Sequence, residues 1–203
     1  MAMYEYTDKI IRYLTKQIIR TFGKAKVLLL SFDELNVLDY SAEMYKYLRE
    51  ITFKAYWKLA EYVYHKNLPK GAKGKITEAW LRDFLASYDP VTKYVYDHEV
   101  DRREARFAES VIASINRAKE IEAGMRSWSR MVNQYAIGVT DASALKAYAD
   151  GGVERVIWIT EDDEKRCSEC KKREGNIYDI AKVPPKPHPG CRCKLYPYFG
   201  ADD

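Results

Sequence analysis

The sequence lacks cysteine before position 167, and all four of its cysteines lie between positions 167 and 193. It also lacks a long apolar run, because the longest one, residues 27–30, is far too short to span a bilayer. No basic start followed by an apolar stretch marks a secretory signal peptide. We therefore expect a protein made and folded in a cytosol, where disulfide bonds are disfavoured, with no membrane partner.

The sequence has no large excess of one charge sign, since it contains 34 Lys and Arg residues and 30 Asp and Glu residues, and its formal net charge is only +4. A dedicated DNA-binding protein usually has a denser basic face, so charge alone does not indicate nucleic-acid binding. Apolar residues make up 47% of the chain, which is enough for a core of ordinary size. The 17 tyrosines suit interfaces, but we favour the outer layer of a helix bundle as their place.

Apolar residues recur at helical spacing over most of the chain before position 150. The first stripe is expected to end at Gly23 and consists of Ile11, Leu14, Ile18 and Phe22. Ser31 and Glu34 have the spacing of a capping box, which predicts the start of a second helix that reaches about His65.

Three more helical segments are expected further along. Residues 77–87 predict a short helix, and residues 91–135 carry a long helical pattern in which Gly124 marks a kink or a break. Residues 142–149 predict a helix that closes at Gly151. The body of the protein is therefore predicted to be mainly α-helical.

The character of the sequence changes after Gly152. Residues 153–159 alternate and are rich in β-branched and aromatic side chains, which predicts a strand, and residues 194–198 predict a second one. A unit this small and rich in loops cannot stabilise itself by burial alone, which is the situation in which proteins use a metal ion. The predicted fold class is a mainly α-helical body with a small C-terminal α+β zinc-binding unit at residues 153–199.

Two pairs of metal-ligand residues lie in this unit. Cys167 and Cys170 form a CxxC pair, His188 and Cys191 repeat the spacing, and Cys193 follows. Two such pairs about 15–20 residues apart are typical of zinc sites, because each tight turn places two ligand atoms on one side of the ion. A closed structural site takes four ligands, so one of the five is left over. We expect one structural zinc ion on the first four, with Cys193 replacing Cys191 or His188 as the alternative.

The competing interpretations of the cysteines are a disulfide pair, a redox-active CxxC of the thioredoxin type, and free thiols. The redox interpretation requires a CxxC at the start of a helix in a βαβ setting, and no such pattern surrounds Cys167. Three thiolates and one neutral imidazole would leave the zinc site with a charge of −1. Seven nearby basic residues can offset that charge: Lys165, Arg166, Lys171, Lys172, Arg173, Arg192 and Lys194.

No catalytic motif is found, so we expect neither enzyme activity nor a small-molecule substrate. His98 and Glu99 begin like the metalloprotease motif HExxH, but Arg102 stands where the second histidine is needed. A zinc deaminase would carry HxE upstream of PCxxC, and no HxE precedes the CxxC pair here. Neither a GxxxxGK[ST] phosphate loop nor a GxSxG elbow occurs.

The order of features near the C-terminus resembles the phage Mu F-like minor head proteins, the bacteriophage head morphogenesis family. In that family a helical region leads to a W-[IT] strand, then D-x-x-x-C-x-x-C, a glycine, and a proline-rich run ending in H-P-x-C-R-C. The matching positions are Trp158, Ile159, Thr160, Asp163, Cys167, Cys170, Gly175, Pro185, His188, Pro189, Cys191, Arg192 and Cys193. The resemblance assigns residues 101–203 to the family domain and leaves residues 1–100 as a helical N-terminal region without a match.

The resemblance implies a structural minor capsid protein, made in the host cytoplasm and located in the virion at the capsid or portal vertex. Its expected partners are the phage portal protein or other head and scaffold proteins, with residues 1–100 as the docking region, and its expected role extends to DNA packaging or ejection. The alternative is a zinc-dependent nucleic-acid-binding module that acts on phage DNA through the basic residues around the cysteines. Binding of that kind would weaken steeply with salt, because each phosphate contact releases counterions.

Overall fold

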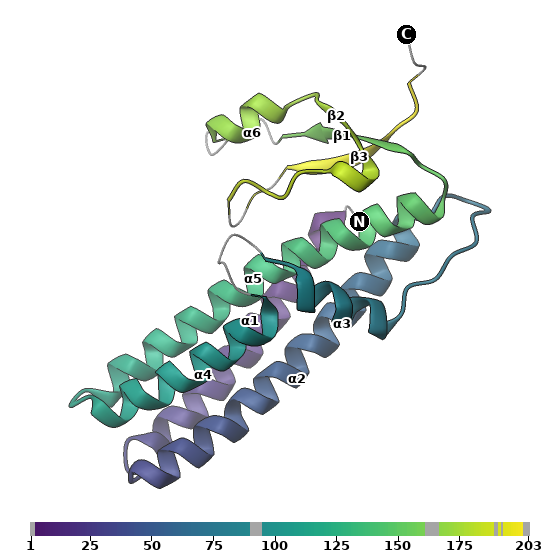
Figure 1. Cartoon of the computed structure of the whole chain (residues 1–203). Coiled ribbons are helices and arrows are strands. Elements are labelled where there is room, and N and C mark those ends of the chain that lie inside the picture. Colours follow the sequence, from purple (N-terminus) through teal and green to yellow (C-terminus); the bar gives the residue numbers. More distant parts are fainter. Residues whose placement is uncertain (1–2, 90–94, 161–166, 189–190, 192, 201–203) are drawn as a thin grey trace.

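Four long helices form the body of the protein in the computed structural model, which describes residues 3–89, 95–160, 167–188, 191 and 193–200. They are α1 (Met3–Leu29), α2 (Glu34–Asn67), α4 (Tyr96–Ala113) and α5 (Arg117–Asp150), and they lie side by side (Figure 1). The short helix α3 (Glu78–Ser87) packs against α2 and α4. α2 and α5 each contact the other three long helices. None of the described helices is long and apolar enough to cross a membrane.

A small antiparallel sheet follows α5 and lies against the C-terminal half of that helix (Figure 1). Its central strand is β1 (Arg155–Ile159), paired on one side with β2 (Ile177–Asp179) and on the other with β3 (Lys194–Tyr198). The helix α6 (Ser168–Arg173) joins β1 to β2, and the 3-10 turn η1 (Ile180–Lys182) follows β2. The predicted fold class, a mainly α-helical body with a small C-terminal α+β unit, is confirmed.

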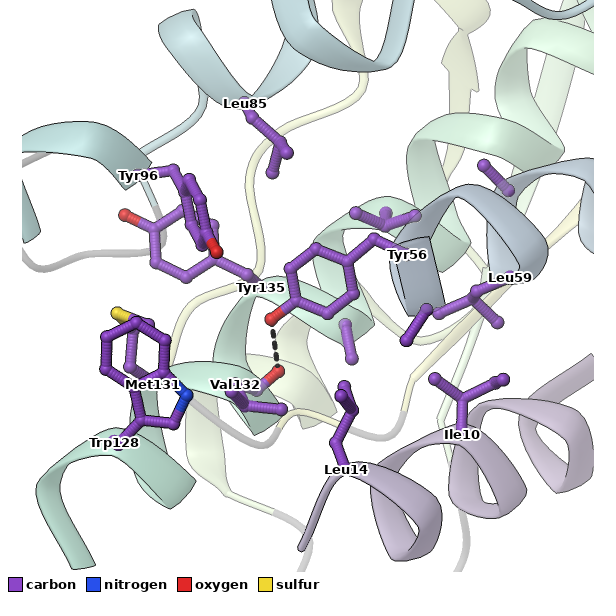
Figure 2. Close-up of a cluster of buried hydrophobic side chains, with 14 of the residues drawn as sticks. Ile10, Leu14, Tyr56, Leu59, Leu85, Tyr96, Trp128, Met131, Val132 and Tyr135 are labelled. Atoms are coloured by element: carbon purple, nitrogen blue, oxygen red, sulfur yellow. Dashed lines mark hydrogen bonds between the residues drawn. The ribbon is translucent and has the colours of Figure 1, made fainter. Parts of the chain in front are cut away.

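The core of the body is aromatic as well as aliphatic (Figure 2). Tyr56 of α2 is fully buried and donates a hydrogen bond of 2.8 Å to the carbonyl oxygen of Val132 in α5. Tyr45, Tyr64 and Tyr135 are also fully buried. The preference for the outer layer is therefore wrong for these tyrosines, because a buried ring adds apolar area while its hydroxyl can reach a polar partner.

The first two helices differ from their predicted bounds. α1 continues through Gly23 to Leu29, and both Ala25 and Leu29 are fully buried beyond the glycine. Burial of those last turns outweighs the cost of about 1 kcal/mol that glycine carries inside a helix. α2 is capped by Asp33 instead of Ser31, since the Asp33 carboxylate accepts a hydrogen bond of 2.9 Å from the Asn36 amide.

The break in the long helical pattern lies at residues 114–116 and not at Gly124. Asn116 caps α5 by accepting a hydrogen bond from the Lys119 amide, and α5 then runs unbroken to Asp150. A Cβ atom at Gly124 would lie 2.5 Å from the ring of Phe107 in α4. Gly124 therefore permits the close approach of two helices and does not interrupt one.

Candidate metal centre

Three segments of the sheet unit bring the five predicted ligands together. Cys167 is the N-cap of α6, where its sulfur accepts a hydrogen bond of 3.3 Å from the Cys170 amide. His188 follows the proline-rich segment, and Cys193 stands directly before β3, whose first residue Lys194 pairs with Ile159 of β1. The start of a helix and the start of a strand thus fix both ends of the cluster.

Cys170 lies at the centre of the ligand atoms. Its Sγ is 3.5 Å from Nε2 of His188 and 3.6 Å from Sγ of Cys191. Two groups of three, each with all ligand atoms within 4.8 Å of one another, share it: Cys167, Cys170 and His188, and Cys170, Cys191 and Cys193. The thiols are free, and the separation of the Cys170 and Cys191 sulfurs is far longer than the ~2.05 Å of a disulfide bond.

The cluster is buried on one side and accessible on the other. Cys170, Cys191 and Cys193 are buried, whereas Cys167 and His188 are partly exposed. Burial raises the pKa of the Cys170 thiol far above its ordinary value and also raises the pKa of Cys191. The hydrogen bond from the Cys170 amide lowers the pKa of Cys167. A cation bound here would displace thiol protons, so metal binding is coupled to proton release.

One part of the argument against a redox-active CxxC pair, that no helix begins at Cys167, is wrong. A helix does begin at this pair, because α6 starts directly after Cys167. The second requirement is not met, since the described sheet is antiparallel in the order β2-β1-β3 and contains no βαβ unit. Cys167 is partly exposed and its pKa is lowered, so the argument against a redox pair rests on the absence of a βαβ unit among the described residues.

Several basic residues near the cluster make contacts within the unit. Lys172 pairs with Glu169 at 2.8 Å, and Arg173 donates a hydrogen bond of 2.7 Å to the Pro185 carbonyl oxygen while its guanidinium lies over the Trp158 ring. These two side chains are therefore partly engaged before any partner binds. Of the predicted residues, the following lie outside the described part of the chain: Asp163, Lys165, Arg166, Pro189 and Arg192.

Three residues that sequence reasoning missed join the cluster to the helical body. Lys186 donates a hydrogen bond to the carbonyl oxygen of Cys193 and lies 3.3 Å from the carboxylate of Asp141 in α5. Tyr4 of α1 donates to the same carboxylate at 2.5 Å and lies 3.1 Å from the Cys193 carbonyl oxygen. No periodicity or motif marks these positions, because the contact joins residues far apart in the sequence.

The cluster combines four sulfur atoms and one imidazole, which is a donor set suited to a borderline or soft cation. The five residues that the sequence predicts as ligands are all described and lie together, and the cluster can hold a metal ion. Comparison with known proteins returns no match: no family model fits the chain, and no curated protein and no solved structure is significantly similar to it.

Proposed function

We propose that the chain is a bacteriophage minor capsid protein, a structural component of the head that associates with the portal or procapsid and carries one structural zinc ion. The observation that supports the proposal is the closed Cys/His cluster in the order of the head morphogenesis motif. Trp158 is fully buried in the central strand, Cys167 caps α6, and Cys193 leads into β3. The motif residues that the structure describes therefore lie in one folded unit.

The distances within the cluster are compatible with a tetrahedral zinc ion. A tetrahedral zinc ion with Zn–S bonds of about 2.3 Å and Zn–N bonds of about 2.05 Å separates two sulfurs by about 3.8 Å and a sulfur from a nitrogen by about 3.5 Å. The Cys170–Cys191 and Cys170–His188 separations of 3.6 and 3.5 Å are close to these values. Cys167 completes our preferred set, and the alternative is that Cys193 replaces Cys191 or His188.

A structural role for the ion agrees with the composition of the cluster. Neither group of three contains an Asp or Glu among the described residues, so the candidate ligand atoms there are thiols and an imidazole. The surplus of thiols closes the coordination sphere instead of leaving a position for a substrate. We therefore propose a protein without enzyme activity, in which the ion holds the sheet unit together.

The tip of the helical body farthest from the sheet is the surface that we propose for docking to head proteins. The α1–α2 and α4–α5 turns meet there, since Arg117 donates hydrogen bonds to the carbonyl oxygens of Leu29 and Phe32 at 3.0 and 2.6 Å. Exposed apolar side chains gather around these turns, and together they are called the tip surface: Val27, Leu28, Leu30, Leu35, Leu38 and Ile115. Clustered exposed apolar residues of this kind mark protein–protein contacts.

Quantitative mass spectrometry of purified procapsids and virions tests the proposal. We expect a few copies of the chain per portal, and its absence from both particles would exclude a head component. Within the tip surface, the double change Val27→Ser and Leu35→Ser should remove the chain from particles without altering its circular dichroism. Ile19→Ser is the matched control, because Ile19 is also exposed on α1 but lies outside the tip surface; this variant should still enter particles.

The zinc-dependent nucleic-acid-binding module receives less support. Lys172 and Arg173 are engaged with Glu169, Pro185 and Trp158, which reduces the basic surface around the cluster. Such a module would bind duplex DNA at low salt and lose the binding after chelation. Binding that survives chelation would not come from this unit.

A further inference from the structure

A pocket of about 280 Å³ lies between α4 and α5, and Tyr45 of α2 contributes to its wall. Four arginines line it, and we call it the arginine pocket: Arg102, Arg103 and Arg106 from α4, and Arg130 from α5. Ser110 and Ser127 add hydroxyl groups to the lining. Arg106, Ser110 and Arg130 are exposed, so the pocket is open to solvent. No residue of the sheet unit lines it.

The positive charge of the arginine pocket is not balanced by the carboxylates around it. Glu99 is fully buried, and its one carboxylate pairs with both Arg102, at 3.2 Å, and Arg103. Arg106 and Arg130 have no ion-pair partner in the part of the chain that the structure describes. Glu120 is the one acidic residue in the described lining. Four guanidinium groups are thus associated with two carboxylates.

Arg103 is the most buried of the four arginines around this excess of positive charge. Only 15% of its side chain is exposed, and its Nε is buried without a hydrogen-bond partner among the described residues. Burial lowers the pKa of Arg103, and the positive charges of Arg130 and Arg106 act in the same direction. A bound anion would supply the missing acceptor and would relieve the repulsion between the three guanidinium groups.

We propose that the arginine pocket binds a phosphate group. A guanidinium presents a planar fork of N–H donors that pairs with two oxygens at once. A carboxylate can occupy one such fork, whereas a tetrahedral phosphate offers enough oxygens for several forks and for the serine hydroxyls. The volume suits a single phosphate group, which belongs either to a free small anion or to the backbone of a nucleic acid. This inference is independent of the zinc ion and of the proposed role in the phage head.

Thermal unfolding of the metal-loaded full chain in inorganic phosphate, against chloride at matched ionic strength, tests the site. A ligand that binds only the folded state raises the unfolding midpoint, so phosphate should raise it in a concentration-dependent way. The double variant Arg106→Gln and Arg130→Gln should lose this rise. Each lost charged hydrogen-bonding group weakens binding roughly tenfold, or about a hundredfold for the pair. Both side chains are exposed, so the fold should survive, and circular dichroism checks this.

Arg126→Gln is the matched control, because Arg126 is an exposed arginine of the same helix that does not line the pocket. A second arm measures fluorescence anisotropy of a short labelled DNA duplex without terminal phosphates. DNA binding that the double variant loses and the control keeps assigns the site to backbone phosphate. If phosphate raises the unfolding midpoint but no such DNA binding is seen, the arginine pocket is assigned to a free phosphate or a small phosphorylated anion. The proposal is overturned if the double variant keeps the full phosphate-dependent rise, because phosphate also stabilises folded proteins without a site. It is overturned as well if phosphate gives no rise over chloride and the double variant binds DNA as the unmodified chain does.

Discussion

Asp141 of α5 and Lys186 of the proline-rich segment form a nearly buried ion pair, with Oδ2 and Nζ 3.3 Å apart and 11% and 9% of the two side chains exposed. Tyr4 donates a hydrogen bond to the other carboxylate oxygen of Asp141. Lys186 also donates to the carbonyl oxygen of Cys193. The start of α1, the second half of α5 and the segment that leads to Cys193 therefore meet at a single carboxylate, which holds the Cys/His cluster against the helical body.

The change Asp141→Ala is expected to destabilise the folded state by about 3–5 kcal/mol, because it leaves the Lys186 ammonium buried without an opposite charge. Urea unfolding followed by circular dichroism measures the loss. The double change Asp141→Leu and Lys186→Met should recover most of it, since removing both charges abolishes the desolvation cost along with the attraction. A loss below about 1 kcal/mol in the single variant would show that other contacts attach the sheet unit.

Chelation of the metal should open the sheet unit and leave the helical body folded. The long helices bury their own core, in which Leu14, Tyr56 and Trp128 are fully shielded from solvent. The sheet unit depends instead on the cluster that joins α6 to β3. Hydrogen exchange measured by mass spectrometry should show rapid exchange of residues 155–159 and 194–198 after chelation, with residues 128–148 still protected. Equal protection of both strands and an equal unfolding midpoint with and without metal would contradict a structural ion.

Single serine substitutions should separate the essential ligand from the surplus one. Cys170 belongs to both groups of ligand atoms, so Cys170→Ser should abolish stoichiometric metal binding. Cys193→Ser should keep one ion, because Cys167, Cys170, His188 and Cys191 remain as a full set of four. Native mass spectrometry of each variant, with and without chelator, reads the stoichiometry directly. One bound ion in Cys170→Ser, or none in Cys193→Ser, would require a different ligand set.

Asp150 at the end of α5 should make stability depend on acid pH. Burial, the largest single effect, raises the pKa of Asp150, but the hydrogen bond from Tyr64 and the hydrogen bonds and charge of Lys146 together hold it below its ordinary value. A carboxylate whose pKa is lower in the folded state stabilises that state above its unfolded-state pKa, and this contribution disappears as the pH falls through the folded-state pKa.

Asp150→Asn should therefore lower the free energy of unfolding at pH 7 by about 1 kcal/mol, the size expected for a partly exposed, hydrogen-bonded pair. The difference between variant and unmodified chain should shrink as the pH falls below about 4. Urea unfolding at several pH values gives both quantities. A difference that stays constant down to the acid limit would mean that the side chain acts through its shape and not through its charge.

Sequence patterns located the helices and strands that are determined by their own neighbouring residues. The strand predicted at 194–198 has the bounds of β3, and the short helix predicted from 77 is α3, capped by Thr77. α6 and β2 were missed because six and three residues are too few for a periodic pattern. β2 is a strand through its pairing with β1, where Ile177 lies opposite Ile157.

At the candidate site, too, residues close in sequence could be predicted, whereas residues that only packing brings together could not. The clustering of the five candidate ligands could be predicted because metal geometry imposes short, regular spacings on the chain. Tyr4, Asp141 and Lys186 could not, because Tyr4 and Asp141 stand 137 positions apart and only packing brings them together. The charge imbalance of the arginine pocket was hidden for the same reason, since Arg103 and Arg130 come from different helices.

Two glycines inside helices should respond in opposite ways to substitution by alanine. A Cβ atom at Gly138 in α5 would lie 2.3 Å from the ring of Tyr88, which is stacked on Phe84. Gly138→Ala should therefore destabilise the fold by about 1–3 kcal/mol, the usual cost of overpacking, despite the better helix propensity of alanine. A Cβ atom at Gly23 in α1 would meet no atom within 4 Å, so Gly23→Ala should stabilise the fold by up to about 1 kcal/mol. Unfolding in urea compares the two variants, and a stabilised Gly138→Ala would show that Tyr88 moves aside and that close packing does not select the glycine.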